Sequence, residues 1–157
     1  MRFFALDEAR FGLKTWFRRR WCPFGFRPRW VFQDKYAWLW LYAAVEPRTG
    51  ESFCLFMPRL DGDCFGVFLR ELKKAYPADE IILVSDRAGS HTSGQVVWPE
   101  GIESLLLPAC NPELDPMERW FEELRAALSN EVFATIEAMG SSAINRGRCQ
   151  NGVHGGS

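Results

Sequence analysis

Residues 80–86 read Glu80-Ile81-Ile82-Leu83-Val84-Ser85-Asp86, an apolar run that ends in a serine and an acid. Such a run is typical of a strand that is buried on both faces. Just before it, between Cys64 and Tyr76, apolar residues recur at helical spacing until Pro77 ends the pattern. A helix followed by a buried strand indicates an α/β domain, in which helices cover the faces of a sheet.

Further strands are predicted on both sides of this pair. Residues 2–6 are short, apolar and aromatic and predict a first strand, and the apolar run 36–45 predicts a central strand. Residues 47–50 contain Pro and Gly and predict a turn, from which residues 51–57 return antiparallel. Residues 103–108 predict one more strand. A hairpin followed by α/β units implies a mixed sheet with helices on its faces.

The last strong helix has the clearest beginning. Asp115 suits its N-cap, Pro116 suits its first position, and Glu118 falls at the third position, as in a capping box. A weaker helical pattern continues over residues 131–139. Residues 140–157 show no periodicity and little that could be buried, so we expect this tail to be disordered.

Composition narrows the class of protein. The chain has 157 residues, enough for one domain, and its 47% hydrophobic and 25% charged residues are typical of a globular protein. The N-terminus turns polar at Asp7, too soon for a signal peptide, and the longest apolar run is too short to span a bilayer. We therefore expect a cytoplasmic protein without a membrane partner. Five cysteines without a Cys-x-x-Cys spacing, and two histidines, favour neither a zinc site nor a disulfide framework.

Charge is unevenly distributed, although the net charge is only −1. Residues 1–35 contain nine Lys and Arg but three Asp and Glu. Such a block indicates either a phosphate-binding patch or a solvated loop. Trp16, Trp21 and Trp30 lie among its arginines, and rings beside cations suit nucleic acid. The candidate DNA contacts are Lys14, Arg18, Arg19, Arg20, Arg27 and Arg29.

Three acids stand out by their position. Asp7 follows the first predicted strand, Asp86 follows the fourth, and Glu118 lies in the first turn of the last strong helix. Sites in α/β sheets gather at the carboxyl ends of strands, and three clustered carboxylates would repel one another unless they held a divalent metal. Metal at such a cluster suits phosphodiester chemistry. Alternatively, Asp7 and Asp86 are turn residues and Glu118 belongs to a helix cap.

Several motifs resemble those of mariner-like transposases of the bacterial insertion-sequence group numbered six-thirty, which carry a DDE endonuclease domain. The matching segments are residues 5–13, Gly25-Phe26-Arg27-Pro28, residues 42–51, residues 83–91 and residues 107–120. The resemblance implies a ribonuclease H-like fold, an α/β domain with a mixed five-stranded sheet flanked by helices. Its first three strands would be antiparallel and the later ones parallel.

The resemblance also implies an activity. Asp7, Asp86 and Glu118 would be catalytic metal ligands for Mg²⁺ or Mn²⁺, with two ions in the active complex. Water would hydrolyse the phosphodiester at the end of the insertion sequence, and the freed 3′-hydroxyl would attack target DNA. The implied partners are terminal inverted repeats, target DNA and a second copy of the chain, at the nucleoid of a bacterial cell.

Two residues depart from the family's pattern: Arg87 replaces the usual Asn after the second acid, and Asp115 replaces an Asn before the third. With Glu8 and His91, they are candidate accessory residues. We expect the catalytic domain to cover residues 1–139 and the tail, 140–157, to be disordered or frame-disrupted. The family's N-terminal helix-turn-helix domain is expected to be missing and supplied, if at all, from a separate reading frame.

Three functions therefore stay open. The first is a transposase catalytic domain, which as a remnant would have little activity alone. The second is an inactive DNA- or protein-binding module of the same fold. The third is a different ribonuclease H-like nuclease, acting on RNA–DNA hybrids or DNA junctions.

Overall fold

The computed structural model describes residues 1–27, 29, 31–86, 96–107 and 116–147 and, for the backbone, 149–151. Its strands are β1 (Arg2–Gly12), β2 (Trp38–Val45), β3 (Ser52–Met57), β4 (Ile81–Ser85), β5 (Ile102–Leu106) and β6 (Cys149–Asn151). Its helices are α1 (Gly62–Ala75), α3 (Pro116–Leu128) and α4 (Ile136–Gly147). None of these helices is long and apolar enough to cross a membrane.

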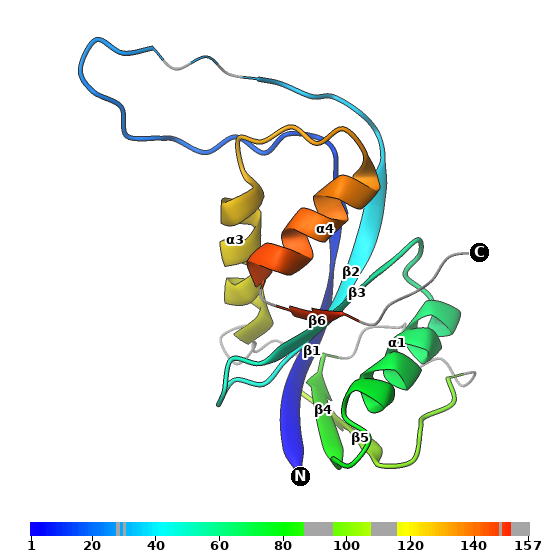
Figure 1. The fold of residues 1–157 in the computed structure, drawn as a ribbon. Coiled ribbons are helices and arrows are strands. Elements are labelled where there is room, and N and C mark those ends of the chain that lie inside the picture. The colour runs from blue at the N-terminus through cyan, green and yellow to red at the C-terminus, as the bar shows by residue number, and fades with distance from the viewer. Residues whose placement is uncertain (28, 30, 87–95, 108–115, 148, 152–157) are drawn as a thin grey trace.

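The strands form one mixed sheet in the order β5-β4-β1-β2-β3-β6 (Figure 1). β1, β2 and β3 pair antiparallel, whereas β4 pairs parallel with both β1 and β5. The predicted mixed sheet, antiparallel first and then parallel, is therefore confirmed. A sixth strand, β6, adds to the five predicted and pairs parallel with β3.

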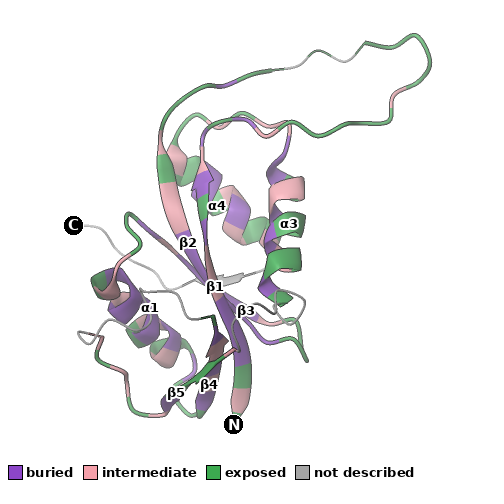
Figure 2. Cartoon of the chain, turned by 180° about the vertical axis from the view of Figure 1, so that it is seen from behind, coloured by how far each residue is buried: buried purple, intermediate pink, exposed green. Residues whose placement is uncertain are grey.

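Helices cover both faces of the sheet, and alternation along the strands decides which residues meet them. Phe4 and Leu6 of β1 belong to the core under α1, which contributes Phe65 and Phe68. Phe11, on the other side of β1, belongs to the core under α3 and α4 (Figure 2). β1, like β2 and β3, therefore contributes to both cores.

β1 is longer than predicted. Residues 2–6 were predicted as the start of the first strand, with Asp7 at its end, but the pairing with β2 continues to Gly12. The polar residues at positions 7 and 8 do not interrupt it, because β2 supplies a complete antiparallel partner and Phe11 is buried beyond them. Asp7 therefore lies within the strand and not after it.

The expectation of a disordered tail was wrong for residues 140–147 and 149–151, which form most of α4 and β6. The helix packs through small residues that a search for large apolar periodicity overlooks. Met139, Gly140 and Ala143 are buried, and a Cβ on Gly140 would lie 3.3 Å from the Phe56 ring. Residues 152–157 lie outside the described residues. Cys54 of β3 is disulfide-bonded, which the sequence analysis also did not predict.

Residues 14–37, here called the arm, form an extended excursion between β1 and β2 that projects from the body (Figure 1). Backbone hydrogen bonds fix its base: Leu13 N donates to Ala37 O at 2.9 Å, and Thr15 N donates to Gln33 O at 3.1 Å. Further out, rings such as Trp21 and Phe24 are fully exposed. The outer part of the predicted basic loop thus stands clear of the core, whereas its base is packed, with Thr15 and Gln33 buried.

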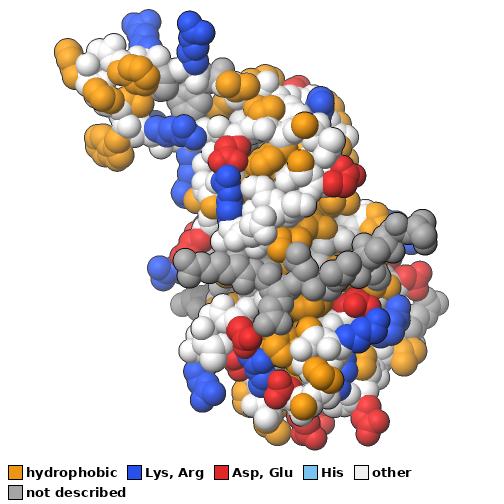
Figure 3. Space-filling model, in the orientation of Figure 1, with side chains coloured by type: hydrophobic (Ala, Val, Ile, Leu, Met, Phe, Trp, Pro, Cys, Tyr) orange, Lys and Arg blue, Asp and Glu red, His pale blue; other side chains and the backbone are white. Residues whose placement is uncertain are grey.

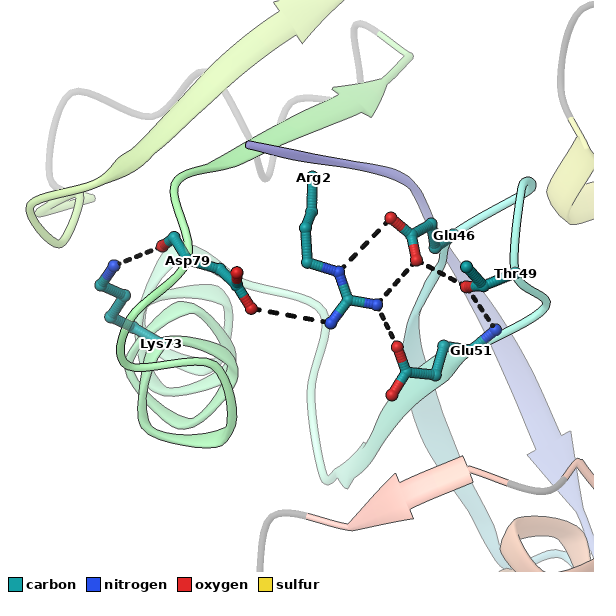
Figure 4. A network of polar contacts seen from close by, with 6 residues as sticks. All are labelled: Arg2, Glu46, Thr49, Glu51, Lys73 and Asp79. Atoms are coloured by element: carbon teal, nitrogen blue, oxygen red, sulfur yellow. Dashed lines mark hydrogen bonds and ion pairs between the residues drawn. The ribbon is translucent and has the colours of Figure 1, made fainter.

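An ionic network holds the start of β1 (Figure 4). The Arg2 guanidinium donates to Glu46 Oε2 at 2.7 Å and to Glu51, and it lies 3.7 Å from Asp79 Oδ2. Thr49 Oγ1 also donates to Glu46, at 2.5 Å. The network ties β1 to the β2–β3 turn and to the segment before β4.

Candidate active site

Asp7 and Asp86 follow the last pairs that join β1 to β4. The parallel pairing of the two strands sets Ala5 opposite Val84 and ends there. Asp7 and Asp86 each lie two residues further on, so a continuation of this register would set them side by side at the carboxyl end of β4. Asp7 pairs with Ala43 of β2, and Ala5 and Ala43 both belong to the core under α3, so Asp7 lies on the α3 face of the sheet. Asp86 would share that face if the alternation of β4 continued by one residue.

The strands around Asp86 fix its backbone. Ser85, directly before it, is buried and pairs with Leu106 of β5, and its carbonyl accepts a hydrogen bond from Leu107 N at 2.8 Å. Asp86 itself is exposed. Asp7 is half-buried, and one of its carboxylate oxygens accepts a hydrogen bond from Glu8 N at 2.8 Å. Asp86 is thus a solvent-facing acid and Asp7 a partly sheltered one.

Glu118 approaches the same face from α3. Its neighbour Met117 is fully buried, and Phe121 one turn later is also buried, in the core that β1 shares. Glu118 is exposed and lies in the first turn of the helix. An acid there is favourable to the helix dipole whether or not it binds metal, so the helix-cap interpretation also fits its position.

Three carboxylates on one face are the oxygen donors that Mg²⁺ and Mn²⁺ prefer. Within the described ranges, however, no three Asp, Glu, His or Cys side chains lie close enough together to hold a metal ion. The assignment of Asp7, Asp86 and Glu118 as a metal site therefore stays a prediction.

The accessory residues are only partly described. Glu8 pairs in register with Tyr42, which lies in the core under α1, so Glu8 does not share the face of Asp7. There, burial and, secondarily, the charge of Glu8 raise the pKa of Tyr42, whose hydroxyl donates to Arg59 O at 3.1 Å. Arg87, His91 and Asp115 lie outside the described residues.

The predicted DNA contacts lie on the arm, where basic and apolar side chains gather together (Figure 3). All six are exposed: Lys14, Arg18, Arg19, Arg20, Arg27 and Arg29. Two further cations were missed by the sequence analysis, Arg10 and Lys35, which line a pocket at the base of the arm. No local sequence pattern marks them, because Arg10 lies beyond the predicted end of the first strand and its contact with Trp38 depends on the pairing of β1 with β2.

A family model described as DDE superfamily endonuclease matches residues 2–140. The chain belongs to this family. Over 98 residues, this DDE superfamily endonuclease is 31% identical to the uncharacterized protein y4pE/y4sA of Sinorhizobium fredii (strain NBRC 101917 / NGR234), a match that covers 61% of the chain and 73% of that protein.

Solved structures show the same fold. A pre-cleavage Mos1 transpososome is 14% identical with a TM-score of 0.67, and the match covers 96% of this chain and 49% of that one. The Mos1 transposase paired-end complex is 16% identical with a TM-score of 0.62, covering 89% and 46%. The catalytic core domain of BIV integrase is 14% identical with a TM-score of 0.52, covering 91% and 81%. The chain thus has the predicted ribonuclease H-like fold and spans about half the length of the Mos1 chains.

Proposed function

We propose that the chain is the catalytic domain of a DNA transposase, which cleaves DNA at the ends of an insertion sequence and joins the freed end to target DNA. The observation that carries this proposal is the parallel pairing of β1 with β4, whose continuation by two residues would set Asp7 beside Asp86. Membership of the DDE superfamily endonuclease family supports it. So do the Mos1 structures, which are described as a paired-end complex with a transposon end, a strand transfer complex and a complex with Mn.

Asp7, Asp86 and Glu118 are the residues that would hold a pair of divalent ions, Mg²⁺ or Mn²⁺. Metal bound there supplies Lewis-acid stabilisation of the charge that develops on phosphodiester oxygens. The strand pairing around Ser85 would hold the backbone of Asp86 in place. Asp7, which is half-buried, would be the more deeply placed of the two ligands. The basic arm would neutralise backbone phosphates of the bound DNA.

The partners proposed for this activity follow from the reaction. Terminal inverted repeats and target DNA are its substrates, and a second copy of the chain would pair the two ends. A separate subunit would read the repeats, and the reaction would take place on nucleoid DNA in the bacterial cytoplasm. Activity of this chain without that subunit would be low.

A second candidate is an inactive module that keeps the fold and binds DNA or protein. One observation favours it: the described residues include no acid cluster close enough to bind a metal ion. The two candidates differ in metal affinity, so binding of Mn²⁺ and Mg²⁺ separates them.

The test is calorimetric titration of the chain with Mn²⁺ and Mg²⁺, with and without duplex DNA, beside Asp86→Asn and Glu118→Gln. Glu137→Gln is the matched control, because Glu137 also lies in the first turn of a helix, α4. The transposase proposal expects binding in the wild type and the control and its loss in both site variants. A folded wild-type protein that binds no metal, even with DNA, would overturn it in favour of the inactive module.

A further inference from the structure

A pocket of about 330 Å³ opens where the arm joins the sheet. The end of β1, the start of β2 and both ends of the arm form its walls. Its side chains are three cations and three aromatic rings: Arg10, Lys14, Lys35, Trp16, Tyr36 and Trp38. Four of them, Arg10, Lys35, Tyr36 and Trp38, were not among the DNA contacts expected from the sequence.

The cations make the pocket electropositive. The Arg10 guanidinium lies 4.9 Å from the centre of the Trp38 ring, in a cation–π contact that holds both side chains at the rim. Lys14 Nζ lies 3.8 Å from Asp34 Oδ1, an acid that offsets one of the three positive charges. Lys35 is exposed beside them. A positive surplus of this kind attracts a phosphate group.

The rings are available for stacking. Tyr36 and Trp38 pack edge to face, with centroids 6.5 Å apart, and are 75% and 49% exposed. Exposed rings of this size beside cations suit the faces of nucleobases. In a duplex, neighbouring base pairs cover those faces, so Tyr36 and Trp38 can stack only on an unpaired base.

The pocket lies within reach of the acids on the same strand. Arg10 and Gly12 follow Asp7 by three and five residues, or about 10–17 Å along β1. One DNA strand places a phosphate about every 3.4 Å along the duplex axis, so this distance corresponds to about three to five nucleotides. Arg10 lies on the face of β1 opposite to Asp7, because an odd number of residues separates them along the strand.

We infer that this pocket holds one unpaired nucleotide of single-stranded DNA near the cleavage site. Its phosphate lies against Arg10 and Lys35, and its base stacks on Trp38, beside the Tyr36 ring, which stands perpendicular to Trp38. This inference rests on the proposed function and extends it, because it assigns residues that bind a DNA strand at an unpaired base.

The test measures fluorescence anisotropy of a short labelled oligothymidylate, and of a duplex, at several salt concentrations in EDTA. Trp38→Ala should weaken oligothymidylate binding about tenfold, because stacking on one ring is lost, whereas Trp38→Phe should keep most of the affinity. Arg10→Gln and Lys35→Gln should each lower the salt slope by about 0.7. Phe3→Ala is the control, because Phe3 is 50% exposed at the other end of β1 and should leave binding unchanged.

Equal affinities in Trp38→Ala and Phe3→Ala would overturn the inference. So would equal losses for single strand and duplex, or a change of oligomeric state in Trp38→Ala with DNA affinity intact. If Trp38→Phe binds as weakly as Trp38→Ala, stacking is not the cause and the inference fails. Since EDTA removes metal from this assay, its result is independent of the calorimetric test, and either proposal can fail while the other stands.

Discussion

Asp7 and Asp86 would be neighbouring like charges at the proposed site. Two neighbouring carboxylates repel each other, and this repulsion destabilises the fold until a cation offsets it. Asp86→Asn should therefore abolish metal-dependent nicking of DNA and, without metal, raise the melting temperature. Thermal unfolding in EDTA and a plasmid-nicking assay with Mn²⁺ check the two effects. Cleavage at the wild-type rate in Asp86→Asn would remove Asp86 from the site.

Glu46 is a buried acid whose negative charge stabilises the folded state. The hydrogen bond from Arg2 holds the pKa of Glu46 below its ordinary value, against the opposing effect of burial. The ionised form is therefore the stabilising one. Its contribution is complete above the ordinary pKa of a glutamate and disappears as the pH falls through the lower pKa of the folded state.

Glu46→Gln should accordingly destabilise the protein by about 1–3 kcal/mol near neutral pH, because Arg2 loses a buried ionic partner but keeps Glu51. The difference from wild type should shrink in acid. Urea unfolding across the acid range measures it. Glu123→Gln, which breaks an exposed pair with Arg119, is the control and should cost well under about 1 kcal/mol at any pH.

At the scale of elements, strands and helices with large apolar residues were predictable, whereas those that depend on small residues or on partners were not. β4 and α1 lie where the sequence placed them, because their apolar periodicity is unambiguous. The predicted helix ended at residue 139, whereas α4 continues to Gly147. The prediction stopped there because Gly140 and Ala143, which face the sheet, are small and give no strong apolar pattern. β1 was cut short because the pairing that extends it comes from β2, which lies far away in sequence.

The approach of α4 to β3 can be tested through Gly140. Gly140→Leu should destabilise the protein by about 1–3 kcal/mol, because the Cβ position lies 3.3 Å from the Phe56 ring and the rest of the side chain has to displace it. Ser141→Leu puts the same side chain on the exposed side of α4 and should be close to neutral. Denaturant midpoints of the two variants give the comparison. Equal midpoints would mean that α4 does not pack closely on the sheet.

The candidate site was predicted to the same partial extent. The three acids were selected by their positions at the ends of strands and in the first turn of a helix, and their role as metal ligands stays a prediction. The face on which Glu8 lies could not be read without the full length of β1, since alternation has meaning only within a continuous strand. The pocket at the base of the arm joins residues from four segments, and no local pattern marks it.

For the whole molecule, the arm separates positive charge from the acidic remainder of the chain. Arg18, Arg19 and Arg20 lie on its exposed first half. Replacing all three with Ala should weaken duplex binding and lower the salt slope by up to about 2.7, since each phosphate contact contributes about 0.9. The matched control replaces Arg48, Arg59 and Lys74, three exposed cations of the body. An unaltered slope in the arm variant would identify the arm as a solvated loop.

β6 has a consequence for handling the protein. This strand of three residues lies on the outer side of β3 and occupies backbone groups that would otherwise form a bare sheet edge. Bare edges are templates on which other chains can add strands. A protein shortened after Gly147 should therefore self-associate as its concentration rises, which light scattering would detect. β6 is therefore expected to limit aggregation, and a purification tag is better placed at the N-terminus.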